Sequence, residues 1–203
     1  MYLRNKFYLF IVYMNKDIIF LGIQWCGKGT QAKMLLKDLK EYWYFEMGQT
    51  LRALMLNENM IGGYIKDIVN SGKMIDDFIT HDLFHTGIKI AQTNNKNLII
   101  DGFPRLKTQA EFFSKKMHEM NRDYVVIHLE LSKQQALERM VKRASIEWRK
   151  DDTPEAMEQR IDIFMNETMK VIQHFEEMGK VITIDANWSI DDIENKLRTQ
   201  LGL

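Results

Sequence analysis

The stretch GIQWCGKGTQ, residues 22–31, brings three glycines, a lysine and a threonine together. A short apolar run precedes it and a helical pattern follows it, so we expect the turn to join a strand to a helix. The unpaired N–H groups at a helix start, together with the helix dipole, attract anions. Gly27 would let the backbone approach a phosphate, and Lys28 would supply a mobile positive charge. These residue types at this spacing predict a phosphate-binding loop.

The turn departs from the strict pattern of such loops at two places. Gly29 separates Lys28 from the hydroxyl of Thr30, whereas the pattern G-x-x-x-x-G-K-[ST] places the hydroxyl directly after the lysine. Trp25 also puts a bulky side chain where these loops usually keep the backbone bare. A purely structural glycine-rich turn is the alternative interpretation. The flanking strand and helix favour the nucleotide site.

A second polar stretch follows another apolar run. DGFPR, residues 101–105, comes directly after NLII, and Gln109 stands four residues beyond Arg105. An aspartate at the carboxyl end of a buried strand is well placed to hold Mg²⁺ through its water shell. Arg105 offers a planar guanidinium that suits a phosphate. The sequence therefore predicts a second group of phosphate and magnesium ligands, with Asp101 as the acid.

Strands and helices alternate around these two stretches. Apolar runs at 17–21, 97–102, 124–131 and 181–186 predict buried strands, and 43–45 predicts a short edge strand. Helical patterns occur at 30–40, 107–121, 133–145, 154–178 and 190–201. Thr153 with Pro154, and Ser189 with Asp192, are start signals for the last two. The alternation predicts an α/β fold with a mostly parallel sheet that is covered on both faces.

Composition limits the classes of partner. The chain has 203 residues, enough for one domain, and its 28 Lys+Arg balance 28 Asp+Glu. A net charge of zero gives no electrostatic argument for a nucleic-acid or anionic-membrane partner, and we expect neither. The single cysteine, Cys26, excludes an intrachain disulfide and a multi-cysteine zinc site. It also fits a reducing, cytoplasmic environment.

We interpret residues 1–16 as an N-terminal extension. FYLFIVY, residues 7–13, resembles the apolar core of a signal peptide, but no small-residue cleavage site follows it. The favoured interpretation is that Met14 is the natural start and that residues 1–13 lie upstream of it.

Several motifs together resemble the adenylate kinase family of nucleoside monophosphate kinases. They recur in family order over residues 17–203: GKGTQ at 27–31, MGQTLR at 47–52, GKMI at 72–75, DGFPR with Gln109, ERMVKR at 138–143, and RKDD at 149–152 with Arg160. The resemblance implies a P-loop NTPase-type fold, with a parallel five-stranded sheet covered by helices on both faces. It further implies one kinase domain at 17–203, with a helical NMP-binding insertion at 46–80 and a short lid at 143–152. The implied reaction is transfer of the γ-phosphoryl group of MgATP to AMP, giving two ADP, by a monomer.

The resemblance also assigns roles to individual residues. The implied ATP-binding residues are Gln24, Trp25, Cys26, Gly27, Lys28, Gly29, Thr30 and Arg139. The implied AMP-binding residues are Met47, Gly48, Arg52, Lys73, Ile75, Gly102, Arg105, Gln109, Arg149 and Arg160. The implied catalytic residues are Lys28, Arg105, Arg143, Arg149 and Arg160. Asp101 would hold Mg²⁺ through water.

Three positions depart from the family pattern. Trp25 replaces a glycine, Met47 replaces a small hydroxyl residue near the acceptor base, and Gln49 stands where an aspartate is usual. The last change leaves Asp101 as the only acid expected near the metal. A UMP/CMP kinase and a catalytically weakened nucleotide-binding homologue therefore stay open as alternatives. Gln109 argues against the first, and the full set of arginines argues against the second.

Overall fold

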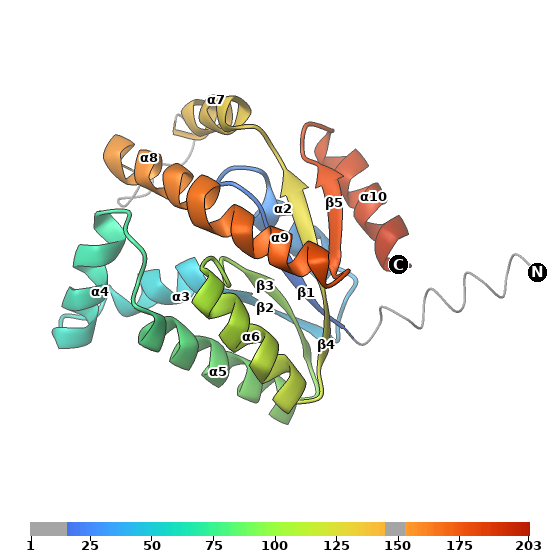
Figure 1. Cartoon of the computed structure of the whole chain (residues 1–203), viewed down its shortest axis with the longest axis horizontal. Helices are drawn as coiled ribbons and strands as arrows, with labels where there is room; N and C mark the ends of the chain where they lie inside the picture. The colour runs from blue at the N-terminus through green and yellow to red at the C-terminus, as the bar shows by residue number, and fades with distance from the viewer. Residues whose placement is uncertain (1–15, 145–152) are drawn as a thin grey trace, which may run out of the picture.

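The protein is seen here as a computed structural model that describes residues 16–144 and 153–203, with the side chains of 143 and 144 left out (Figure 1). Its centre is a parallel sheet of five strands in the order β2-β3-β1-β4-β5. The strands are β1 (Lys16–Leu21), β2 (Tyr42–Glu46), β3 (Asn97–Asp101), β4 (Asp123–Glu130) and β5 (Val181–Asp185). The predicted α/β fold with a parallel five-stranded sheet is confirmed.

Helices cover both faces of this sheet. They are α2 (Lys28–Leu36), α3 (Met47–Leu54), α4 (Met60–Asn70), α5 (Asp77–Thr93), α6 (Lys107–Glu119), α7 (Lys133–Ala144), α8 (Pro154–Ile163), α9 (Met169–Glu177) and α10 (Ile190–Leu201). Helices α2 and α10 pack together on one side, whereas α5, α6 and α9 lie on the other (Figure 1). Because the strands are parallel, each connection returns the chain to the edge of the sheet where the strands start. All five strands therefore end at the opposite edge, and the polar residues that follow them are brought together there.

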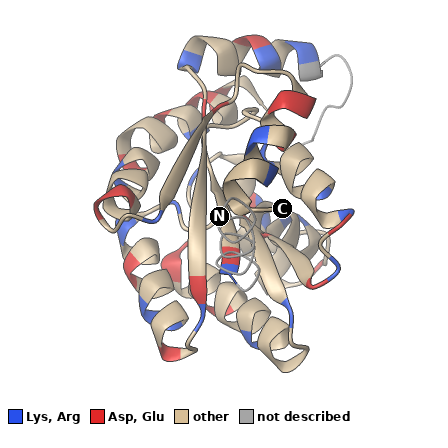
Figure 2. Ribbon diagram, turned by 90° about the vertical axis from the view of Figure 1, so that its right-hand side faces the viewer, with Lys and Arg blue, Asp and Glu red and all other residues tan. Residues whose placement is uncertain are grey.

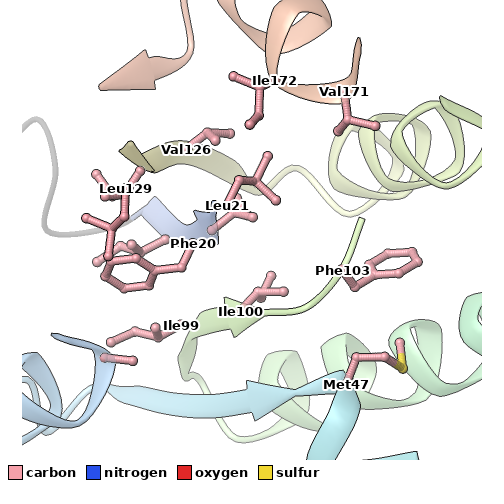
Figure 3. Close-up of a cluster of buried hydrophobic side chains, with 14 of the residues drawn as sticks. Phe20, Leu21, Met47, Ile99, Ile100, Phe103, Val126, Leu129, Val171 and Ile172 are labelled. Carbon is pink, nitrogen blue, oxygen red and sulfur yellow. The ribbon is translucent and has the colours of Figure 1, made fainter. Parts of the chain in front are cut away.

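The core lies where the central strands meet these helices. Phe20, Ile99 and Ile100 are fully buried in the sheet, and Val171 and Ile172 of α9 close over it (Figure 3). Each such side chain contributes roughly 1.5–3 kcal/mol through the removal of apolar surface from water. The strands β1 and β4 are buried along most of their length, which explains their mostly apolar sequences; Asp17 and His128 are the buried polar residues within them.

The edge strands are less buried. β2 was expected at 43–45 as an edge strand, and it occupies that place with one more residue at each end. β5 was expected to be buried, but only Ile184 within it is, because β5 forms the opposite edge. Its apolar sequence gave no sign of this, since a strand's place in the sheet depends on its partners.

The predicted start signals are present. The Thr153 side chain accepts a hydrogen bond from Ala156 N, and Ser189 accepts one from Asp192 N. The single helix predicted at 154–178 is interrupted, however. A π-helical segment, Phe164–Thr168, separates α8 from α9. Such segments shift the register of a helix by one residue and are frequent at functional sites.

Charged residues of both signs are mixed along the helices on the side that Figure 2 shows. Within 16–144 and 153–203, the structure contains no helix that is long and apolar enough to cross a bilayer.

Candidate functional site

A cleft of about 550 Å³ opens at the carboxyl ends of the central strands. The predicted site residues that line it are Gln24, Trp25, Gly27, Lys28, Gly29, Thr30, Met47, Gly48, Arg52, Lys73, Ile75, Asp101, Gly102, Arg105, Gln109, Arg139 and Arg160. Among the predicted residues described here, Cys26 does not line the cleft, because its side chain is buried behind the loop. The Arg143 side chain and Arg149 lie outside the described residues.

The turn between β1 and α2 has the geometry of an anion receptor. Gly27 precedes α2 with φ 104°, a conformation that glycine adopts without steric penalty, and no side chain caps the helix. The first N–H groups of α2 are thus left for a ligand in the cleft. The Lys28 ammonium lies against the turn, donating to Gly22 O at 2.8 Å and to Ile23 O at 3.0 Å. One positive charge and several N–H groups converge on the same space.

Trp25 is accommodated in this turn in a left-handed conformation. Its φ is 64°, where a β-carbon is unfavourable by roughly 1–2 kcal/mol. Its indole is partly buried against the core. Arg139 of α7 reaches the same turn and donates to the carbonyl oxygens of Trp25 and Cys26, at 3.5 and 3.4 Å, and to that of Ala186. The turn is therefore supported from α7 as well as from the core.

Asp101 ends β3 and is 8% exposed. Its Oδ2 accepts a hydrogen bond from the Tyr44 hydroxyl at 3.1 Å. Burial raises the pKa of the Asp101 carboxyl, while the positive charge of Lys28 acts in the opposite direction. Burial and the neighbouring acids also raise the pKa of the Tyr44 hydroxyl, which therefore remains a donor.

From the sequence, Asp101 was expected to be the only acid near the metal, but the structure places a second one beside it. Glu46, the last residue of β2, is the register partner of Asp101 on the neighbouring strand. It lines the cleft and adds to the upward pKa shift of Asp101. Gln49, by contrast, is exposed and does not line the cleft. The second carboxylate thus comes from a strand end and not from the helix position where the family usually has one.

Three guanidinium groups face the same part of the cleft from three elements. Arg52 of α3 binds Glu46, with Nη2 2.7 Å from Oε1, and Arg160 of α8 donates to Val69 O at 3.4 Å. Arg105 Nε donates to Gly102 O at 3.1 Å. Burial lowers the pKa of Arg105, and the like charges of Arg160 and Arg52 lower it further. An arginine stays protonated despite such a shift, so the cluster presents concentrated positive charge.

Gln109 is fixed at the start of α6. Its Oε1 accepts from Arg105 N at 2.9 Å, and its Nε2 donates to Asp77 Oδ1 at 3.0 Å and lies 3.4 Å from Thr80 Oγ1. The side chain is 1% exposed. These contacts fix which end of the amide faces which way. Both amide hydrogens are therefore engaged, and one lone pair of Oε1 remains for a ligand in the cleft.

Several residues of the site were missed from the sequence. Glu46, Thr80 and Ile163 line the cleft. Thr168, in the π-helical segment, donates to Arg105 O at 3.1 Å. Glu46 could have been found, because it directly follows a predicted edge strand. Nothing in the sequence pattern marked Thr168.

The described residues contain no group of three or more His, Cys, Asp or Glu side chains that could hold a metal by themselves. A cation at Asp101 and Glu46 would need further ligands from a nucleotide or from water. Mg²⁺ has this preference, since it keeps several waters and binds one or two carboxylates together with phosphates.

Comparison with known proteins agrees with this geometry. The sequence model of the adenylate kinase family matches residues 20–180. The chain belongs to the adenylate kinase family. The predicted resemblance is therefore confirmed, and with it the assignment as a nucleotide-binding phosphotransferase.

Individual relatives cover nearly the whole chain. It is 31% identical to an adenylate kinase of Cyanothece sp. (strain PCC 7425 / ATCC 29141), over 89% of this chain and 92% of the relative. It is 30% identical to an adenylate kinase of Oenococcus oeni, over 91% of this chain and 97% of the relative. A UMP-CMP kinase of Lentinula edodes is 29% identical over 91% of this chain and 85% of its own length.

Proposed function

We propose that this protein is an adenylate kinase that transfers the γ-phosphoryl group of MgATP directly to AMP, giving two ADP. One observation carries the proposal. The cleft that contains the phosphate-binding turn also contains Arg52, Arg105 and Arg160, which come from three other elements. Two phosphorylated ligands can therefore meet in one space, with positive charge between them. Phosphoryl transfer requires little else, because alignment and charge stabilisation supply most of the catalysis.

The donor would lie on the β1–α2 side of the cleft. Its phosphates would accept hydrogen bonds from the N–H groups at the start of α2, and Lys28 would leave its carbonyl partners to follow the transferring charge. Arg139 would lie near the base of ATP. Asp101 would hold magnesium through water, with Glu46 beside it. The chemistry that magnesium supplies when bound is neutralisation of charge on the β- and γ-phosphates.

The acceptor would lie between α3, α6 and α8. Arg52 and Arg105 would bind its phosphate. Gln109 would read its base with the free lone pair of Oε1 and with an amide hydrogen that it now donates, at 3.4 Å, to Thr80 Oγ1. Arg160 would approach the transferring group from α8. We propose the same closing role for Arg143 and Arg149. We also propose residues 46–80 as the NMP-binding insertion and 143–152 as the lid.

We further propose that the protein acts as a monomer in the cytoplasm. This chain lines both the donor side and the acceptor side of the described cleft, which supports the proposal. The free thiol of Cys26 is consistent with a reducing compartment.

A steady-state assay with MgATP and AMP, UMP, CMP or GMP tests the reaction. We expect ADP formation with AMP to exceed that with the other three acceptors. Tight ATP binding without turnover of any acceptor would instead support a nucleotide-binding protein without catalysis.

Met47 gives a specific reason to test UMP and CMP. Its side chain lines the cleft and is 3% exposed, where the family usually has a small hydroxyl residue. A thioether offers no strong hydrogen bond to adenine. Turnover of UMP or CMP above that of AMP would favour the UMP/CMP kinase alternative.

A further inference from the structure

Glu46 introduces a negative charge into a part of the cleft that is otherwise rich in arginine. It stands at the end of β2, directly beside Asp101 at the end of β3. Its Oε1 lies 2.7 Å from Arg52 Nη2, and the two side chains are 23% and 28% exposed. The pair is thus partly withdrawn from water, where a charge interaction is screened less than at an open surface.

Arg52 lies over the acceptor side of the cleft. A β-carbon added at Gly48 would come within 3.0 Å of Arg52 Nη1, so the guanidinium folds back along α3 over this glycine. A β-carbon added at Gly102 would lie 3.3 Å from Arg105 Nη2 and 3.8 Å from Gly48 N. The two guanidinium groups therefore lie against two neighbouring glycines, and the charge of Arg52 acts on the pKa of Arg105. A phosphate placed there would reach both.

The Glu46 carboxylate occupies one of the two donors that such a phosphate would use. Phosphate and carboxylate both accept hydrogen bonds from a guanidinium in the same fork geometry. A bound phosphate must therefore share Arg52 with Glu46 or displace it, and its own negative charge is repelled by the carboxylate. Both effects act against the acceptor.

We propose that Glu46 sets the affinity of the acceptor site by competing with the acceptor's phosphate for Arg52. Glu46 then weakens the binding of nucleoside monophosphates and speeds their exchange. The inference rests on the proposed function, because it takes Arg52 as a ligand of the acceptor phosphate. The affinity for the acceptor would then depend on Glu46, the last residue of β2.

The test is calorimetric binding of AMP to the full chain and to Glu46→Gln, supported by the KM for AMP. Glutamine keeps the shape of the side chain and removes its charge. We expect the Kd and KM for AMP to fall about three- to tenfold, the scale of one charge interaction at a partly shielded site. Glu46→Asp keeps the charge and should bind AMP more like the unmodified protein than like Glu46→Gln.

Glu41→Gln is the matched control. Glu41 lies just before β2, at its other end, and pairs with Lys96 at 3.1 Å. Its removal should leave the Kd for AMP unchanged. Should Glu46→Gln fail to fold, Glu46→Ser also removes the charge and carries the same expectation.

Unchanged or weaker AMP binding in a folded Glu46→Gln protein would overturn the proposal. Weaker binding would mean that Glu46 orients Arg52 for the phosphate. Failure of the proposed function gives a different result, because the unmodified protein would then neither bind AMP nor form ADP.

Discussion

The two ends of the sheet each bury an aspartate, and they treat it differently. At the amino end, Asp17 is 1% exposed and accepts hydrogen bonds from Arg122 at 2.6 and 2.8 Å and from Leu98 N at 2.6 Å. At the carboxyl end, Asp101 is 8% exposed and has the Tyr44 hydroxyl as its hydrogen-bond donor. The nearby Lys28 ammonium is directed to backbone carbonyls instead.

We interpret the first aspartate as part of a structural charge pair and the second as part of the proposed site. Around Asp17 both oxygens have partners within the protein, so the group joins β1 to β3 and to the residue that precedes β4. Around Asp101 the hydrogen-bond donor is a neutral hydroxyl, while Lys28 donates to carbonyl oxygens and Arg52 to Glu46, and all of these residues except Tyr44 line an open cleft. Unused hydrogen-bonding capacity of this kind remains available for a ligand. Substitutions at the two ends should therefore affect different measurements.

Lys28→Met should have the largest effect on activity. It removes the mobile charge from the phosphate-binding turn while the long apolar stem is retained. We expect kcat to fall on the order of a thousandfold, comparable with the loss of a group that stabilises developing charge in a transition state. The thermal midpoint should change little. A steady-state assay of ADP formation, with a melting curve of each protein, checks both parts.

Arg122→Met should have the opposite signature. Removing one partner of a buried ion pair leaves an uncompensated charge and destabilises a protein by about 3–5 kcal/mol. We expect this loss in the free energy of unfolding, measured by urea titration, with the kcat of the folded fraction preserved. Lys96→Met is a control, since Lys96 pairs with the exposed Glu41 at the same end of the sheet. A fall in kcat without a fall in stability would contradict the comparison.

Much of this comparison could be predicted from the sequence. The strand–turn–helix pattern around 22–31 and the aspartate after NLII were enough to bring Lys28 and Asp101 to one cleft. The physical reason is that all strands of a parallel sheet end at the same edge, so residues that follow them must meet.

The rest depended on tertiary structure. Glu46 lies beside Asp101 because β2 pairs with β3 in one particular register, and a short edge strand does not specify its register by its own sequence. The π-helical segment at Phe164–Thr168 was equally hidden. Its sequence continues the helical pattern, and its contact with Arg105 O depends on how the helix packs against the turn after β3.

Besides the two aspartates, a buried histidine should have a smaller, pH-dependent effect on stability. His128 of β4 is 5% exposed, and its Nδ1 has no hydrogen-bond partner among the described residues. Burial lowers the pKa of this imidazole, and burial lowers that of His81 as well. The folded state thus binds these protons less readily than the unfolded chain does.

The contribution of these two histidines to stability should accordingly be constant above a pH of about 6.5 and fall as the pH decreases below it. His128→Leu removes one of the two groups, so the loss of stability between about pH 7.5 and 5.5 should become smaller. His118→Gln, at an exposed position of α6, controls for the loss of an imidazole. Urea titrations at several pH values measure the slope. An equal slope in His128→Leu would mean that this histidine does not contribute.

Trp25→Gly tests the position at which the turn between β1 and α2 departs from the family pattern. Its effect on activity and stability should be the smallest of those considered. Glycine adopts the φ of 64° without penalty, whereas the tryptophan is strained there by roughly 1–2 kcal/mol. Loss of the partly buried indole acts in the opposite direction on stability. The turn would be freer to close around the phosphates, so we expect kcat to rise a few-fold with little net change in stability.

Trp25→Asn, which tolerates the same conformation but keeps a β-carbon, should give an intermediate rate. If kcat falls or stays the same in both variants, the contacts of the indole with the core and of the Trp25 carbonyl with Arg139 have compensated for the strain. The turn would then be adapted to tryptophan.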